Sequence, residues 1–153
     1  MMSARDILIY LATKYSGDWN AIYKAILDKE DAKMEDVQEI NSKIRSKCLT
    51  ILDDEYPETL KSIRNPPFVL FYYGDISLIR TYDRCLSVVG SREYSEYGKT
   101  STEKIIDELN GQFVIVSGLA SGIDSIAHRR AIDNGGKTVE VLGCGIARCF
   151  LIE

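Results

Sequence analysis

The stretch VVGSREYSEYG, residues 88–98, carries the transition that decides the fold, because an apolar run stops at a glycine and polar residues lead into a helix-like pattern. The run starts earlier, as CLSVVG over residues 85–90, and its β-branched side chains are typical of a strand buried on both faces. Ser95 can cap a helix over residues 96–109. Three apolar residues of that helix are spaced to face inward: Ile105, Ile106 and Leu109. The stretch therefore predicts a strand, a loop and a helix.

The same order of elements continues toward the C-terminus. FVIVSG, residues 113–118, is typical of a second buried strand, and GIDSIAHRRAIDN, residues 122–134, of a helix closed by Gly135 and Gly136. KTVEVLG, residues 137–143, predicts a third strand. Alternating strands and helices predict an α/β fold, in which a parallel sheet with right-handed crossovers carries flanking helices.

The N-terminal part has a different, helical pattern. Residues 4–15 place apolar side chains on one helical face, Asp18 can cap a second helix, and the spacing within residues 37–44 predicts a shorter third helix. We therefore expect a small helical N-terminal domain, residues 1–46, followed by the sheet-containing domain, residues 47–153.

Composition and charge narrow the class of protein. The chain has 153 residues, 45% hydrophobic and 27% charged, and its formal net charge of −4 argues against a generally basic nucleic-acid-coating protein while allowing a local positive patch. No apolar run has the length of a bilayer span and no signal peptide is recognisable, so we expect no membrane contact. The cysteines form no C-x-x-C pair, which favours reduced thiols over a disulfide or metal site: Cys48, Cys85, Cys144 and Cys149.

The loops after the three predicted strands are expected to meet at the carboxyl edge of the sheet, where open α/β sheets bind ligands. These loops are rich in glycine, which allows close approach of a ligand: Gly90, Gly118, Gly122, Gly143 and Gly145. Arg92 leaves the first strand at this edge and can give a bidentate pair to a phosphate. The edge is therefore predicted to bind an anion. The alternatives are simple tight turns and a surface arginine paired with Glu93 or Asp124.

Two residues of the second helix are expected to support this edge. Asp124 lies in the first turn, where it complements the helix dipole and would repel a phosphate, so we expect it to hold Arg92. His128, the single histidine, is expected to pack or form hydrogen bonds near the loops. There is no G-x-G-x-x-G fingerprint, no nucleophile with a base partner and no pair of carboxylates, so no catalytic constellation is evident, and we expect no metal and no cofactor.

Three segments together resemble one family. YPETLKSIRNPPFVLFYYGD, VVGSREYSEYG and IVSGLASGIDSIAHRRAIDNGGKTVEVLGCGI resemble the DNA-processing protein A family, DprA or Smf, over roughly residues 56–146. The resemblance implies a Rossmann-like domain in a bacterial cytoplasmic protein that binds single-stranded DNA. It further implies loading of a RecA-type recombinase in natural transformation and recombination, a homodimer in the full-length form, and no enzymatic activity.

The resemblance also assigns site residues. Gly90, Ser91 and Arg92 match the loop with which the family contacts phosphate and DNA. A second loop is matched by five residues: Ser117, Gly118, Gly122, Ile123 and Asp124. Basic and aromatic side chains could border these loops and stack on bases: Lys99, Arg129, Arg130, Arg148, Tyr94 and Tyr97. For Arg129 and Arg130 a solvated helix face is the alternative.

Two departures from the family pattern stand out. Ser121 replaces the Arg or Lys of many members, which removes one positive contact, and Gly145 leads into IARCFLIE instead of a Tyr-Pro pair. We therefore expect a truncated or frameshifted member, or a fragment of one, that lacks the later elements of the Rossmann-like domain that members use to dimerise.

Two other functions remain open from the sequence. Related Rossmann-like proteins bind nucleotides or small anions, and some hydrolyse nucleotides. Those enzymes generally carry a PGGxGTxxE-type motif that this sequence lacks. The third reading is an inactive fragment that keeps only protein contacts.

Overall fold

The computed structural model describes residues 2–80, 82–109 and 111–143. The chain forms two compact units, Met1–Ile76 and Ser77–Glu153, and each is described by itself. The domain boundary expected from the sequence, between residues 46 and 47, lies ahead of this division. The residues that follow the helices form a sheet of their own, which packs with the helical core of the first unit. That residues 1–46 form a domain of their own therefore stays a prediction.

Three helices open the first unit, as the sequence predicts. They are α1 (Ala4–Lys14), α2 (Trp19–Leu27) and α3 (Met34–Ser42). Ser3 and Asp6 form a capping box at the start of α1, and the Asp18 carboxylate caps α2 as expected. Buried apolar residues of all three helices form one core: Tyr10, Leu11, Ala12, Ile22, Ala25 and Val37.

A two-stranded antiparallel sheet completes the first unit. Its strands are β1 (Lys47–Thr50) and β2 (Val69–Tyr72), and the short α4 (Glu58–Lys61) lies between them in sequence. Two 3-10 turns, Ile76–Ile79 and Tyr82–Arg84, follow β2. Aromatic and aliphatic side chains at β2 pack against the helical core: Phe68, Val69 and Phe71.

The second unit is the predicted parallel sheet with flanking helices. The strands β3 (Cys85–Ser87), β4 (Val114–Ser117) and β5 (Thr138–Glu140) lie in the order β3-β4-β5, and both neighbouring pairs are parallel. They alternate along the chain with α5 (Glu96–Leu109) and α6 (Ile123–Asp133). Ser95 caps α5 as expected, because its hydroxyl accepts a hydrogen bond from Gly98 N at 3.1 Å. The predicted α/β fold class is confirmed.

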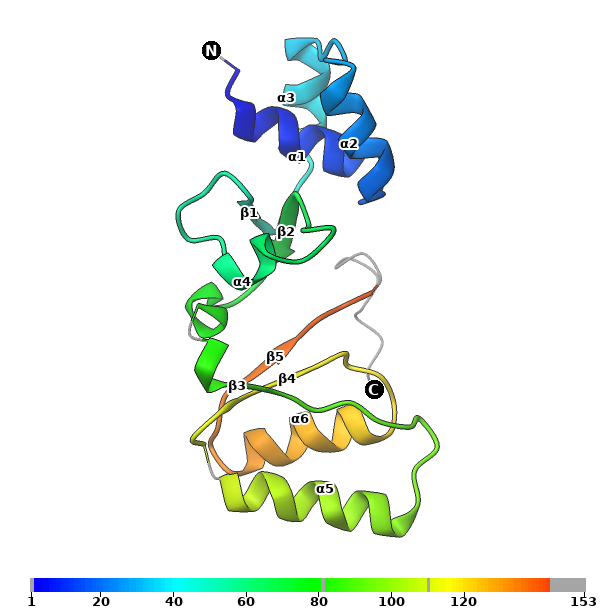
Figure 1. The fold of residues 1–153 in the computed structure, drawn as a ribbon, viewed down its shortest axis with the longest axis vertical. Coiled ribbons are helices and arrows are strands. Elements are labelled where there is room, and N and C mark those ends of the chain that lie inside the picture. Colours follow the sequence, from blue (N-terminus) through cyan, green and yellow to red (C-terminus); the bar gives the residue numbers. More distant parts are fainter. Residues whose placement is uncertain (1, 81, 110, 144–153) are drawn as a thin grey trace. The chain divides into compact units, whose positions relative to one another are not determined.

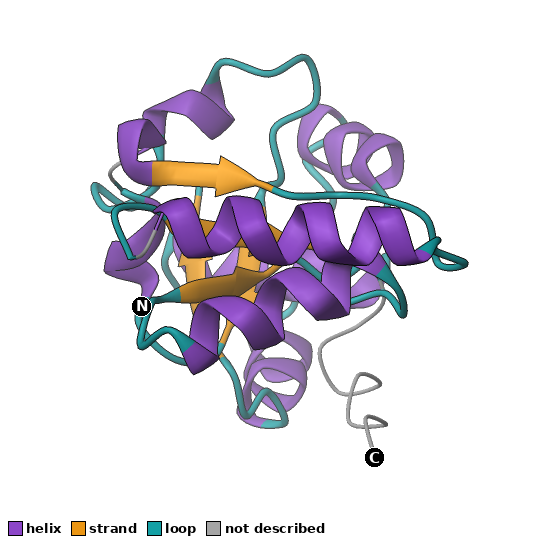
Figure 2. Ribbon diagram, turned by 90° about the horizontal axis from the view of Figure 1, so that it is seen from below, coloured by secondary structure: helices purple, strands orange, loops and turns teal. Residues whose placement is uncertain are grey.

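Both helices of this unit cover the same face of the sheet. Figure 1 shows α5 and α6 together on one side of β3, β4 and β5, and Figure 2 shows them side by side in front of the strands. This follows from the strand order, because right-handed crossovers that always step in one direction place their helices on one face. The core between helices and sheet is small and apolar: Ile106, Ile115, Ala127 and Ala131, with Leu86 and Val88 against it.

The opposite face of the sheet is where sequence and structure differ. In the described part of this unit no helix covers that face, and Val89 and Val141, just beyond β3 and β5, are 76% and 59% exposed. The expectation of strands buried on both faces is therefore wrong for the described residues, because strand order decides helix placement. Ile105, expected to face inward, is 53% exposed, so that prediction is also wrong.

Candidate functional site

The loops after β3 and β4 reach the same edge of the sheet because the strands are parallel. Two backbone contacts interlock them. Ile123 N donates a hydrogen bond to Ser91 O at 3.1 Å, and Gly122 has a φ of +95°. A Cβ atom at Gly122 would lie 2.2 Å from Ser91 O, and one at Gly90 would lie 2.6 Å from Ile123 Cβ. Glycine is required here by the approach of one loop to the other.

Asp124 ties the same two loops together through its carboxylate. One oxygen accepts a hydrogen bond from Gly90 N and the other from Gly118 N, both at 3.2 Å. The side chain is buried, with 6% exposure. In the described residues no hydrogen bond or ion pair joins it to Arg92, so the expectation that Asp124 holds the arginine directly is not met. It holds the backbone from which the arginine extends.

The loop serines are occupied by internal hydrogen bonds. The Ser91 hydroxyl donates to Glu93 O at 2.6 Å and accepts from Glu93 N at 3.2 Å, which shapes the turn that presents Arg92. Ser117 is buried and its hydroxyl donates to Val88 O, which joins β4 to the end of β3. Both serines therefore serve as scaffold for the edge.

Arg92 is the exposed cation of this loop. Its side chain forms no hydrogen bond or ion pair within the described residues, so the expected alternative of a pair with Glu93 or Asp124 is absent there. Two exposed aromatic residues follow it in sequence, Tyr94 and the 81% exposed Tyr97. Lys99 follows in α5 and is half-buried. The edge thus combines a free guanidinium with tyrosine side chains that are open to solvent.

The two arginines of α6 have different surroundings. Arg130 forms a bidentate pair with Asp107 of α5, with Nε–Oδ1 and Nη2–Oδ2 distances of 2.6 Å each, and Asn134 Nδ2 donates to the same carboxylate at 2.8 Å. This pairing lowers the pKa of Asp107 to about 2 and joins the two helices. Arg130 was expected to border the loops, and in the structure its guanidinium is paired with Asp107.

Arg129 is exposed, but its position on α6 does not bring it to the interlocked loops. It lies five positions after Asp124 on the helix, which corresponds to a rotation of about 140° around the helix axis. Arg129 therefore stays a predicted contact on an outer helix face. Ser121 is exposed in the loop before α6.

His128 is a buried residue of α6. The Thr138 hydroxyl donates to Ile115 O at 2.9 Å, so its oxygen accepts from His128 Nδ1–H. The other ring nitrogen is buried without a partner in the described residues. Burial lowers the pKa of His128, while the nearby Glu140 and Asp124 act in the opposite direction. The sequence marks neither Thr138 nor Ser125, whose hydroxyl donates to Ala120 O at 2.6 Å, because these contacts depend on the folded loops.

This environment predicts a pH dependence of stability. Because folding favours the neutral imidazole, the free energy of unfolding is expected to be highest above the ordinary histidine pKa of about 6.5 and to fall as the pH drops below it. The chain has one histidine, so a single ¹H NMR titration measures the folded pKa without assignment. An imidazole that titrates at or above about 6.5 would contradict this placement.

Several expected residues lie outside the described part of the chain: Cys144, Gly145, Arg148 and Cys149. Within residues 2–80, 82–109 and 111–143, no cluster of three or more His, Cys, Asp or Glu could hold a metal ion. In these same ranges no helix is long and apolar enough to cross a bilayer.

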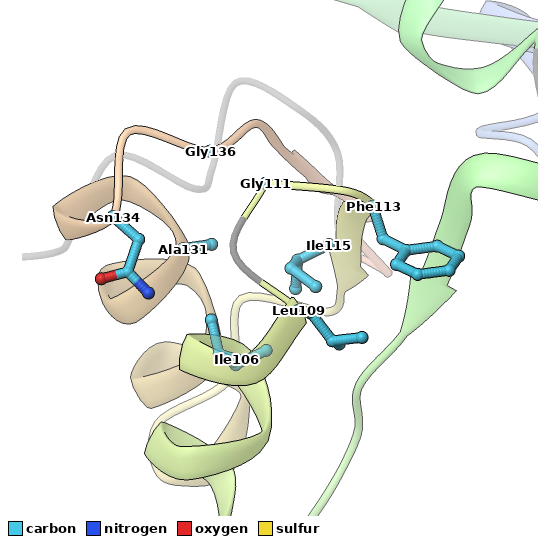
Figure 3. Close-up of a pocket in the computed structure, with 8 residues that line it drawn as sticks. All are labelled: Ile106, Leu109, Gly111, Phe113, Ile115, Ala131, Asn134 and Gly136. Carbon is cyan, nitrogen blue, oxygen red and sulfur yellow. The ribbon is translucent and has the colours of Figure 1, made fainter.

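A cavity in the second unit lies away from the glycine loops. Figure 3 shows Ile106, Ile115 and Ala131 turned toward one another between the ends of α5 and α6 and the starts of β4 and β5. Its volume is about 10 Å³, which is room for roughly one water molecule. This cavity, at the edge of the sheet where the strands begin, is a small gap in the packing. The carboxyl edge remains the candidate site.

Comparisons with known proteins agree with this geometry. The sequence profile of the family described as DNA recombination-mediator protein A matches residues 47–151. DNA processing protein DprA of Streptococcus pneumoniae is 48% identical over 97 residues, covering 63% of this chain and 34% of that protein. DprA of Bacillus subtilis is 39% identical over 103 residues, covering 67% of this chain and 34% of that protein. Protein Smf of Escherichia coli is 37% identical over 92 residues, covering 60% of this chain and 24% of that protein.

A solved structure extends the similarity to the whole chain. The X-ray structure of DNA processing protein A from Streptococcus pneumoniae has a TM-score of 0.76 and 29% identity, covering 99% of this chain and 62% of that chain. The chain thus spans about a third of the length of the curated relatives DprA of S. pneumoniae and of B. subtilis.

Proposed function

Because this chain belongs to the DNA recombination-mediator protein A family, we propose that it binds single-stranded DNA at the carboxyl edge of the β3-β4-β5 sheet and brings a RecA-type recombinase to that DNA. The process it serves is recombination, including the uptake of DNA in natural transformation. The protein acts by binding, in the cytoplasm, and without an enzymatic step. A full-length form works as a homodimer.

The observation that carries this proposal is the free Arg92 side chain on a loop whose backbone is fixed. The loop is held by Asp124 through Gly90 N and by the Ile123–Ser91 backbone bond. Single-strand binders combine cations that follow the phosphates with aromatic side chains on which bases stack. Arg92 supplies the first group, and Tyr94 and Tyr97 supply the second.

Further contacts are proposed around this centre. Lys99 adds positive charge for neighbouring phosphates, and Arg129, on the outer face of α6, adds positive charge for phosphates farther along the strand. The edge itself is shaped by four residues: Gly90, Ser91, Gly118 and Gly122. Ser117 and His128 support it from beneath.

The test is a fluorescence titration of labelled oligo-dT with the 153-residue chain at several salt concentrations. We expect binding whose log affinity falls linearly with log salt, with about 0.7 of slope for each neutralised phosphate. Duplex DNA of the same length is the control, because stacking on tyrosines requires unpaired bases. Absence of salt-dependent binding to oligo-dT, under conditions where the chain is folded, would refute the proposal.

A further inference from the structure

We propose that Asp124 determines ligand specificity: its carboxylate occupies the anion position that the two glycine loops create, and it thereby excludes free phosphate and nucleotides from this edge. The phosphates of a DNA strand then bind to exposed side chains around this edge, above all to Arg92. This second statement rests on the proposed function, while the exclusion of free anions does not.

Backbone geometry is the first support. Gly90 N and Gly118 N come from two different loops and point at the two oxygens of one carboxylate, each at 3.2 Å. Converging backbone amides at the N-terminus of a helix are the groups with which α/β proteins bind phosphate. Here those amides and the start of α6 surround a carboxylate that belongs to the chain itself.

The charge balance is the second support. Asp124 is buried, and no cation pairs with it in the described residues. A buried carboxylate is costly unless hydrogen bonds and dipoles compensate it. The two amides and the positive end of α6 provide that compensation, as they would for a bound anion.

The filled space around the carboxylate is the third support. Ile123 N is engaged by Ser91 O at 3.1 Å, so this amide is also unavailable. The hypothetical Cβ positions of Gly90 and Gly122 show that the two loops already touch. A phosphate could reach the amides only by displacing the Asp124 carboxylate, and otherwise it would lie beside a negative charge.

The consequence is discrimination between a polymer and its monomers. A free nucleotide offers few phosphate charges and depends on the amide site for affinity. A DNA strand offers many phosphates to exposed cations and gains affinity from the counterions that each contact releases. With Asp124 in place, the edge therefore binds a DNA strand but has little affinity for free nucleotides.

The test uses Asp124→Ser, which frees both amides and removes the charge, and Asp124→Asn, which keeps the shape. Asp133→Ser is the matched control, because it removes an exposed carboxylate from the same helix. The Gly90 and Gly118 amide signals are followed in ¹⁵N NMR spectra of the full chain during titration with inorganic phosphate and with AMP at constant ionic strength. We expect no saturable shift in the parent and in Asp133→Ser. In Asp124→Ser phosphate should bind at least about tenfold more tightly than in the parent, and Asp124→Asn should be intermediate.

Two results would overturn the proposal. One is saturable binding of phosphate to the Gly90 and Gly118 amides in the parent chain, a result that can be obtained without any variant. The other is a folded Asp124→Ser chain that gains no phosphate affinity, and if that variant does not fold, Asp124→Asn decides by the same criterion. A parallel titration with oligo-dT separates the two proposals, since a parent that binds neither oligo-dT nor phosphate refutes the DNA-binding function but leaves the exclusion by Asp124 intact.

Discussion

Replacing Arg92 with alanine is expected to weaken oligo-dT binding about tenfold or more, because a charge-assisted hydrogen bond contributes about 1.5–3 kcal/mol. The slope of log affinity against log salt should flatten by about 0.7, the value for one lost phosphate contact on a single strand. In the described residues no side chain is paired with this arginine, so its removal leaves no group without a partner, and folding should be unaffected. The measurement is the fluorescence titration at several salt concentrations, with circular dichroism to verify the fold.

Two further variants sharpen this result. Arg92→Lys should restore the salt slope but only part of the affinity, because the ammonium lacks the planar fork that binds a phosphate with two hydrogen bonds. Arg84→Ala removes an exposed arginine just before β3, at the opposite edge of the same sheet, and should leave affinity and slope unchanged. Equal losses in Arg84→Ala and Arg92→Ala would mean that general charge, and no site at the carboxyl edge, attracts the DNA.

Replacing Gly122 with alanine is expected to cost about 3 kcal/mol or more of the free energy of unfolding. The new Cβ atom would lie 2.2 Å from Ser91 O and 2.7 Å from Arg92 Cα, both of them backbone atoms that cannot rotate away. The φ of +95° adds a penalty of about 1–2 kcal/mol for a residue with a side chain. Urea unfolding followed by circular dichroism gives the difference.

Gly135→Ala provides the matched control for this prediction. Gly135 also has a positive φ, +70°, but a Cβ atom there would meet nothing within 4 Å. Its substitution should therefore cost only the backbone penalty, about 1–2 kcal/mol. If both variants lose the same free energy of unfolding, the contact between the two loops does not contribute to stability and the interlocked edge is disproved.

Helix caps and the order of strands and helices could be predicted from the sequence, because both depend on residues close to one another in the chain. Ser95 and Asp18 were recognisable as caps because a capping side chain bonds to amides within the next turn, and both do so in the structure. The alternation of apolar runs and helical patterns predicted the parallel sheet, because each strand had to be followed by a helix long enough to cross over.

Contacts between distant residues were not predictable in the same way. Asp124 was expected to hold Arg92, but it bonds to Gly90 N, 34 residues away, because the loop approach that creates this contact exists only after the sheet has formed. Arg130 gave no sign of its pair with Asp107, which requires α5 and α6 on the same face. Ile105 was misplaced because it lies about 100° around the helix axis from its neighbour Ile106, and Ile106 is the residue that packs in the core.

The interlocked loops also bear on the rate of the proposed binding to DNA. Ordering a flexible loop costs about 1–2 kcal/mol for each residue whose backbone becomes fixed. Here the backbone around Ser91 is held before any ligand arrives, by Ile123 N on one side and Asp124 on the other. For the proposed complex we therefore expect association without a slow rearrangement of this loop, at a rate set by diffusion and by the attraction between arginine and phosphate. We then expect differences in affinity among DNA strands to arise from the dissociation rates of the complexes and not from their association rates.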